Sequence, residues 1–253
     1  MALFQTTLRS HFLGMNTGVN ILMPTDREQT PDGGFPVLYL LHGMSDDHTS
    51  WLRNTRIEQY AARYSLAVVM PDAQLSFYCD MVHGGMYGSY IARELPDFIR
   101  STFPVTAARA GTFVAGLSMG GFGALKLGLG QPGQFAACAG LSAAITPVQN
   151  ARRGDDPQRH KLVDSVVGDA QTEPPECDLS LLAHKQMQLP AEARTRVYLA
   201  CGTEDFLYEE NRQFRGRLDA LGFAYTYDEG PGRHDWDFWD AYIQKALAFF
   251  LGE

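Results

Sequence analysis

The sequence lacks the features that would place it with membranes, secretion or nucleic acids. It contains no run of 18 apolar residues that could form a transmembrane helix. Residues 1–14 hold no basic segment followed by an apolar core, so we expect a cytoplasmic protein without a membrane partner. The formal net charge is −8 and no Lys- or Arg-rich run interrupts it, which argues against nucleic acid as a partner.

Cysteine is also scarce, with four residues in the chain. None of them forms the C-x-x-C spacing of a metal or redox motif. Cys138 and Cys201 lie in apolar, strand-like runs, where a small buried thiol is common. The sequence therefore disfavours a structural disulfide.

The chain has no Ser/Gly linker, internal repeat or low-complexity block, so we predict one domain over residues 1–253. One segment differs in character. Residues 146–190 combine charged and proline-rich stretches with only short apolar groups. We predict a cap insertion there, above the carboxyl ends of the strands where ligands bind in open α/β sheets. A solvated surface excursion remains the alternative.

Apolar runs and amphipathic stretches alternate through the rest of the chain. The runs typical of strands are 37–41, 66–70, 112–115, 136–141, 196–200 and 223–227. The stretches with helical spacing are 51–64, 90–102, 121–129, 209–221 and 237–251. Residues 19–23 suggest an antiparallel edge strand that pairs with the first residues. The alternation predicts an α/β fold with a mostly parallel central sheet and helices on both faces.

Residues 116–120, Gly-Leu-Ser-Met-Gly, stand between the apolar run 112–115 and the helix-like stretch 121–129. This is the context of a nucleophile elbow, where a sharp strand-to-helix turn holds a serine in strained backbone geometry. Glycines on both sides allow close approach of neighbouring backbone. The free N–H groups at the start of the helix favour negative charge beside the serine. We predict that Ser118 is a catalytic nucleophile.

A serine nucleophile needs a histidine base and an acid that orients it. Asp205 follows the run 196–200, and His234 follows the run 223–227. The order Ser118, Asp205, His234 is the chain order of α/β-hydrolases. The other histidines all precede Asp205, so only His234 fits this order.

The acid has rivals in the sequence. Glu204 adjoins Asp205, while Asp235 and Asp237 lie close to His234. Asp205 also has an alternative role as the cap of the helix predicted near Tyr208. The loop context favours Asp205 as the acid.

An oxyanion hole needs two N–H donors. One is the Met119 amide, and the loop after the strand 37–41 should supply the other. We assign the second donor to the Met44 N–H, with Gly43 as the alternative. Asp46, Asp47 and His48 follow, but no second cluster with ligand spacing accompanies them, so we expect a polar loop and no metal site.

Several motifs together resemble one family. They are Leu41-His-Gly-Met, Trp51, Gly116-Leu-Ser-Met-Gly-Gly-Phe-Gly-Ala, Cys201-Gly-Thr-Glu-Asp and Gly232-Arg-His-Asp-Trp. The combination resembles the esterase family of esterase D type within the α/β-hydrolase superfamily, and is most similar to its bacterial tributyrin esterases. The likeness spans almost the whole chain. It implies an α/β-hydrolase fold, no cofactor, and the triad and oxyanion donors assigned above.

The substrate-binding residues that we predict are Gly43, Trp51, Tyr87 and Trp236. Trp51 and Trp236 match family positions, with packing beneath the active-site loops as their alternative role. Tyr87 has a similar alternative: like Phe77, Tyr78 and Tyr90, it either lines the pocket or packs in the core.

The predicted function is that of a serine carboxylesterase, with a small-molecule acyl ester as substrate. We expect short acyl groups, acetyl to butyryl, with acylated sugars among the substrates. The chain is shorter than a typical S-formylglutathione hydrolase and carries Phe122 after its glycine pair, which disfavours glutathione thioesters. The alternatives are such a hydrolase, a feruloyl or acetyl-xylan-type esterase, and an acyltransferase with the same triad. The sequence leaves open whether the chain forms a homo-oligomer.

Overall fold

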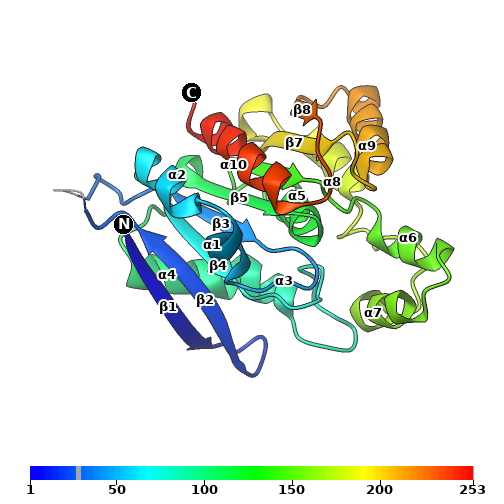
Figure 1. The fold of residues 1–253 in the computed structure, drawn as a ribbon, viewed down its shortest axis with the longest axis horizontal. Helices are drawn as coiled ribbons and strands as arrows, with labels where there is room; N and C mark the ends of the chain where they lie inside the picture. Colours follow the sequence, from blue (N-terminus) through cyan, green and yellow to red (C-terminus); the bar gives the residue numbers. More distant parts are fainter. Residues whose placement is uncertain (27–29, 253) are drawn as a thin grey trace.

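The computed structural model describes residues 1–26 and 30–252 (Figure 1). Within these ranges one sheet of eight strands has the order β1-β2-β4-β3-β5-β6-β7-β8. The first two strands form an antiparallel hairpin, β2 pairs antiparallel with β4, and the remaining strands are parallel. The strands are β1 (Ala2–Arg9), β2 (Asn16–Met23), β3 (Val37–Leu41), β4 (Ala67–Pro71), β5 (Thr112–Leu117), β6 (Ala137–Leu141), β7 (Arg196–Gly202) and β8 (Thr226–Gly230). The predicted parallel sheet and edge hairpin are confirmed.

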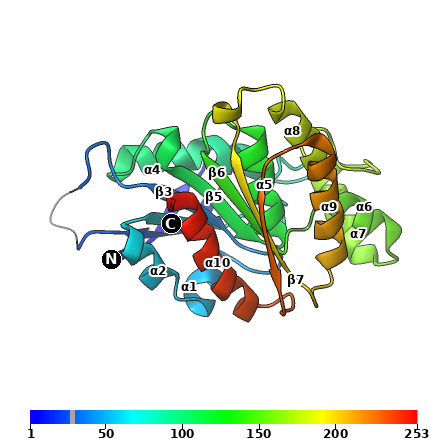
Figure 2. The same ribbon diagram turned by 90° about the horizontal axis from the view of Figure 1, so that it is seen from above.

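Helices cover both faces of the sheet (Figure 2). One face carries α1 (Ser50–Asn54), α2 (Ile57–Tyr64) and α10 (Trp236–Leu251). The other carries α3 (Tyr87–Ser89), the π-helix η1 (Tyr90–Glu94), α4 (Leu95–Thr102), α5 (Met119–Gly130), α8 (Leu179–Gln186) and α9 (Tyr208–Leu221). Short 3₁₀ turns, η2 (Arg109–Gly111) and η3 (Ala191–Ala193), precede β5 and β7. This is the α/β-hydrolase fold.

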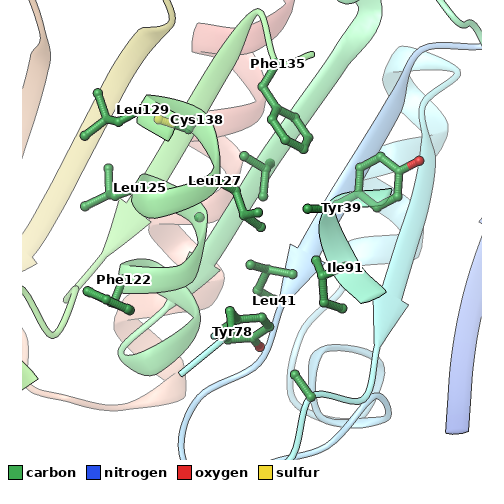
Figure 3. Packing of buried hydrophobic residues seen from close by; sticks show 14 of the residues in the cluster. Tyr39, Leu41, Tyr78, Ile91, Phe122, Leu125, Leu127, Leu129, Phe135 and Cys138 are labelled. Carbon is green, nitrogen blue, oxygen red and sulfur yellow. The ribbon is translucent and has the colours of Figure 1, made fainter. Parts of the chain in front are cut away.

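Helix α5 occupies the centre of one layer (Figure 3). Nearly all of its residues are buried, including Phe122, Leu125 and Leu127. Leu127 points toward Tyr39 and Leu41 of the sheet, while the Phe122 ring lies on the other side of the helix, where it packs on Phe77 at 6.1 Å between ring centroids. A helix that is apolar on all sides is stable only when it is enclosed. The packing fixes the start of α5, where Ser118 lies, against the carboxyl ends of β3 and β5.

Three predicted elements differ from the structure by more than small shifts of their ends. The helix expected over 51–64 is broken between α1 and α2 because Thr55 is extended and its Oγ1 accepts the Ile57 N–H at 3.2 Å. The helix expected over 90–102 begins with the π turn η1, just before Pro96, which has no N–H to donate. The last strand is β8, displaced from the predicted range 223–227 toward the C-terminus.

Residues 146–190 contain more regular structure than their composition suggested. They form α6 (Pro147–Arg153), α7 (Pro157–Val167) and α8. Asp156 caps α7 by accepting the Gln158 N–H, with Pro157 in the first turn. Figure 1 shows α6 and α7 beside the helix layers, away from the antiparallel edge of the sheet. No helix along residues 1–26 and 30–252 has the length and apolar character needed to cross a bilayer.

Candidate active site

Ser118 lies at the turn between β5 and α5, with backbone angles φ 53° and ψ −116°. The strained turn leaves no room for a side chain two residues before or two residues after Ser118. A Cβ at Gly116 would lie 2.3 Å from the Gly120 oxygen, and a Cβ at Gly120 would lie 2.4 Å from the Leu41 oxygen. Both positions therefore require glycine, as the elbow motif predicted.

The structure brings the three predicted triad residues together. His234 Nε2 lies 2.9 Å from Ser118 Oγ, and His234 Nδ1 lies 2.8 Å from Asp205 Oδ2. The Asp205 side chain is fully buried and that of His234 is 17% exposed. In the tautomer with the proton on Nδ1, His234 donates to the carboxylate and its Nε2 accepts the serine proton. This is the arrangement that general-base activation of a serine requires.

The Asp205 carboxylate is held from several directions. Oδ1 accepts the Leu207 N–H at 2.8 Å, while Oδ2 faces His234. Burial alone would raise the Asp205 pKa, but hydrogen bonds from His234, the Leu207 amide and Ser142 outweigh it and lower the pKa below its ordinary value. Asp205 thus stays ionised. It is not the cap of α9, the alternative role considered above, because Leu207 is the N-cap residue and no side chain caps the helix; the Asp205 carboxylate accepts the Leu207 N–H in the turn before it.

The rival acids have other contacts. Glu204 is exposed and lies 3.5 Å from Arg233 at the surface. Asp235 caps α10 by accepting the Phe238 N–H at 3.1 Å. The neighbouring loops are tied by the Glu204 N–H, which donates to the Gly232 oxygen at 3.0 Å. This backbone hydrogen bond holds the loop that contains Asp205 next to the loop that contains His234.

Aromatic rings flank the imidazole of His234. The Phe206 ring lies 4.5 Å away and the Trp239 ring lies 4.9 Å away, edge to face. Trp239 also donates from Nε1 to Ser142 Oγ at 3.2 Å. Because Ser142 in turn hydrogen-bonds Asp205, Trp239 supports both the ring and its acid. Ser142, Phe206 and Trp239 were not predicted from the sequence, because their contacts depend on tertiary structure.

The loop after β3 is held in place by side chains that hydrogen-bond to three of its consecutive carbonyl oxygens. Trp51 Nε1 donates to the Leu41 oxygen at 3.0 Å, and the Tyr78 hydroxyl donates to the His42 oxygen at 2.8 Å. His42 Nδ1 lies 2.7 Å from the Gly43 oxygen. With the carbonyls turned toward these donors, the loop conformation is fixed beside Ser118.

His42 is a further residue that the sequence analysis did not assign. Its ring is buried, and Nε2 accepts the Ala73 N–H at 3.0 Å. Nε2 is therefore unprotonated, and Nδ1–H donates to the Gly43 oxygen. The histidine links the loop after β3 to the loop after β4.

The two amides assigned to the oxyanion hole are free to donate. Within residues 1–26 and 30–252, neither the Met44 N–H nor the Met119 N–H has a hydrogen-bond acceptor. Met119 is the first residue of α5, where helix amides lack partners within the helix. Gly43 lies next to the nucleophile, since its Cβ position would be 3.6 Å from Ser118 Cβ. The N–H groups of Met44 and Met119 can stabilise negative charge on a substrate oxygen.

Replacing Tyr78 with phenylalanine tests the role of the loop. Loss of the hydroxyl leaves the His42 oxygen without that donor, so we expect the free energy of unfolding to fall by about 1–3 kcal/mol. We also expect kcat on a short ester to fall about tenfold with little change in KM, because the Met44 amide loses alignment mainly in the transition state. Steady-state kinetics and urea unfolding measure the two effects.

Tyr39→Phe is the matched control for Tyr78→Phe. The Tyr39 hydroxyl is buried and has no hydrogen-bond partner in the described part of the chain. Its removal should leave kcat unchanged and should not destabilise the protein. Equal kcat values in the two variants would contradict a positioning role for Tyr78.

A cavity of about 90 Å³ opens at Ser118. Its lining is mainly apolar, and α6 and α7 supply about half of it. The residues that line it are Met44, Phe77, Ser118, Met119, Ala144, Pro147, Asn150, Ala151, Arg159, Leu162, Val163, Phe206 and Leu207. The segment 146–190 therefore contributes to the walls around the nucleophile.

The structure places three predicted substrate-binding residues away from this cavity. Trp51 is buried and its Nε1 donates to the Leu41 carbonyl oxygen. The Trp236 ring packs edge-to-face on the Trp51 ring, with 5.3 Å between the ring centroids. Tyr87 is buried in the core. Their rings pack against other residues, which was the alternative role for each of them, and none of the three lines this cavity. Of the four, only Gly43 adjoins Ser118.

The polar residues after Gly43 serve the local turn. Asp47 Oδ1 accepts from the Thr49 N–H at 2.7 Å and from Thr49 Oγ1 at 2.6 Å. The Ser50 N–H donates to the backbone carbonyl oxygen of Asp47 at 3.2 Å. These contacts fix the entry to α1 and give Asp47 a local structural role.

An elbow serine paired with an imidazole, on a mostly parallel sheet, defines a serine hydrolase of the α/β-hydrolase fold that acts on carboxylic esters. Residues 10–250 match the model of the family described as "Putative esterase", and the chain belongs to that family. An acetyl esterase of Caldicellulosiruptor saccharolyticus is 34% identical, with 98% of this chain and 97% of that protein covered.

Two solved structures from Staphylococcus aureus extend the comparison. The fluorophosphonate-binding serine hydrolase FphF is 31% identical with a TM-score of 0.89, covering 100% of this chain and 99% of its own. The S-formylglutathione hydrolase FrmB is 32% identical with a TM-score of 0.84, covering 99% of each chain. Because FrmB matches in length, chain length does not separate this protein from S-formylglutathione hydrolases, contrary to the argument from sequence.

Proposed function

We propose that this protein is a serine carboxylesterase that hydrolyses short-chain acyl esters, acetyl to butyryl. The observation that carries the proposal is the continuous contact from Asp205 through His234 to Ser118, at 2.8 and 2.9 Å. The similarity to an acetyl esterase supports a short acyl group. The proposed ligand is a small-molecule ester, and we further propose a cytoplasmic location, which the four free thiols support.

The mechanism follows from the contacts. His234 Nε2 takes the proton of Ser118 as its Oγ attacks the ester carbonyl. Asp205 holds the imidazole in the productive tautomer and stabilises the imidazolium. The amides of Met44 and Met119 stabilise the oxyanion, the imidazolium protonates the leaving alcohol, and water then hydrolyses the acyl-enzyme by the same steps.

The size of the cavity at Ser118 supports the proposal that the acyl group is short. Its volume of about 90 Å³ is smaller than the roughly 150 Å³ of an apolar protein cavity that admits benzene. An acetyl to butyryl chain fits such a space better than an aromatic acyl group. Asn150 and Arg159 provide polar groups in the same lining, which suit the hydroxyls of an acylated sugar.

The direct test is hydrolysis of p-nitrophenyl esters from acetate to decanoate. We expect the highest kcat/KM between acetate and butyrate and a steep decline beyond hexanoate. A fluorophosphonate probe should phosphonylate Ser118 with loss of fluoride, so that the serine gains the mass of the probe less HF, as expected for a serine nucleophile. Preference for decanoate, or labelling at a different residue, would contradict the proposal.

An S-formylglutathione hydrolase is the second candidate, because FrmB matches over 99% of both chains. The two functions differ in the acyl carrier. Purified enzyme is assayed with S-formylglutathione and with p-nitrophenyl acetate at equal concentrations. A kcat/KM for the thioester at least about 100-fold above that for the ester would favour the second candidate.

Val163 lines both the cavity at Ser118 and a smaller apolar cavity behind it, as do Phe77 and Pro147. We expect Val163→Ala to join the two and to raise the hexanoate-to-acetate ratio of kcat/KM about fivefold, because each buried methylene contributes about 1–3 kcal/mol of discrimination. Val197→Ala is the matched control. Val197 is equally buried but lies on β7 and does not line the cavity. Its truncation should lower stability without changing the ratio.

A further inference from the structure

Two cysteines that are distant in the sequence lie in contact. Cys79 is in the loop after β4, and Cys177 is in the segment between α7 and α8. Their Sγ atoms are 3.3 Å apart, and both residues are buried. The other two cysteines, Cys138 and Cys201, show no such pairing in the described residues. The pair therefore has a chemistry that the other thiols lack.

The surroundings of Cys79 favour the thiolate. The hydrogen bond from Cys177 lowers the pKa of Cys79 to about 7; burial opposes this effect, and the positive charge of Lys126 adds to it. Lys126 is held nearby because its Nζ donates to the Tyr78 oxygen at 2.8 Å. By contrast, burial raises the pKa of Cys138 and of Cys201.

A cavity gives small molecules access to the pair. Both cysteines line a polar cavity of about 360 Å³, together with Lys126 and Glu176. This cavity is distinct from the one at Ser118, with which it shares no lining residue. An oxidant of the size of a peroxide can therefore reach the thiols without entering the candidate active site.

The thiols also contact the walls of the active-site cavity. The Cys79 thiol donates to the Phe77 oxygen at 3.3 Å. Both cysteines line the small apolar cavity of about 10 Å³ that lies behind Val163. Phe77 and Val163 line that cavity and the cavity at Ser118 alike. Phe77 and Tyr78 have φ angles of 49° and 56°, so this backbone is already strained.

We propose that Cys79 and Cys177 form a dithiol site that peroxide oxidises to a disulfide, and that the disulfide narrows the apolar end of the cavity at Ser118. The second part rests on the proposed esterase function. Cys79 thiolate attacks one oxygen of hydrogen peroxide and becomes a sulfenic acid, releasing water after protonation. The Cys177 thiol, whose pKa is raised by its hydrogen bond to Cys79 and by burial, then attacks that sulfur as its proton passes to the departing hydroxyl, which leaves as water. Two thiols and one peroxide thus give one disulfide and two waters.

The geometric consequence follows from bond formation. The sulfur separation falls from 3.3 Å to a covalent distance of about 2 Å. The Cys79 thiol also loses its hydrogen bond to the Phe77 oxygen. Formation of the S–S bond draws the loop after β4 toward Cys177, and loss of the hydrogen bond frees the Phe77 carbonyl to move with that loop. The space for long acyl chains therefore decreases while the triad contacts are unaffected.

The experiment treats the reduced full-length protein with stoichiometric hydrogen peroxide. We expect a peptide pair linked through Cys79 and Cys177 in the mass spectrum, and an approximately fivefold fall in the hexanoate-to-acetate ratio of kcat/KM that dithiothreitol reverses. Cys177→Ser should yield no linked peptide and a dimedone adduct on Cys79. Cys138→Ala, the matched control, should respond like the wild type.

The outcomes separate the two parts of the proposal. Absence of the linked peptide in wild type overturns the dithiol site. A linked peptide with an unchanged acyl ratio overturns the coupling to the cavity. A reduced enzyme that hydrolyses no ester contradicts the proposed function, while the linked peptide still decides whether the dithiol forms a disulfide.

Discussion

Replacing Ser118 with alanine is expected to lower kcat on p-nitrophenyl acetate by about 10⁴- to 10⁶-fold. The variant removes the only hydroxyl within hydrogen-bond distance of His234 Nε2 among the described residues. The oxyanion donors and the apolar cavity remain, so KM should change little. The effect is measured with active-site-titrated wild type and with variant protein purified separately to avoid contamination.

Ser101→Ala is the matched control for this substitution. Ser101 is exposed near the end of α4 and donates only to the Phe98 oxygen. Its variant should keep wild-type kcat. Alanine at residue 118 must adopt the same φ of 53° as serine, so thermal unfolding of the two variants should differ little. Activity above about a tenth of wild type in Ser118→Ala would contradict the nucleophile assignment.

The elbow could be predicted because its determinants are local. A strand, a turn and a helix meet within residues 112–129, and Gly116 and Gly120 are required by atoms of this turn and of the adjacent β3. Apolar runs predict the order of the strands along the chain for the same reason. The parallel sheet follows from alternation of strands and helices.

The residues that position the site could not be predicted in this way. Tyr78 supports the His42 oxygen, and Ser142 hydrogen-bonds Asp205, although each pair is far apart in the chain. Such contacts depend on how two loops pack, which periodicity does not determine. The same limit explains Trp51, whose family position fitted substrate binding but whose indole supports a carbonyl.

Residues 146–190 show an intermediate case. Local signals for its helices are present, because Asp156 with Pro157, and Asp178, stand at helix starts. The place of α7 depends instead on distant contacts. The Val82 N–H donates to the Val166 oxygen at 3.1 Å, which ties α7 to the loop after β4.

The lowered pKa of Asp205 has a consequence for stability. A carboxyl whose folded-state pKa lies below its unfolded value of about 4 stabilises the fold above that value, and this stabilisation is lost as the pH falls through the folded-state pKa. Asp205→Asn should therefore be less stable than wild type at pH 7. The difference in free energy of unfolding should narrow below about pH 4, as urea titrations at several pH values would show.

The same substitution should lower kcat by about 10³- to 10⁴-fold. The Leu207 N–H requires an acceptor at the position of Oδ1, so the oxygen of an asparagine side chain should face Leu207 and its NH₂ should face His234. A donor at Nδ1 selects the tautomer with the proton on Nε2. That tautomer donates to Ser118 and cannot accept its proton, so the nucleophile is not activated.

Glu204→Gln makes the same chemical change at the adjacent residue. Glu204 is exposed and paired with Arg233, so its neutralisation should alter kcat by less than about twofold. A loss in Glu204→Gln that matches the loss in Asp205→Asn would show that the effect comes from the charge of the loop. A large loss confined to residue 205 requires direct contact with the imidazole, because an exposed charge one residue away cannot select its tautomer.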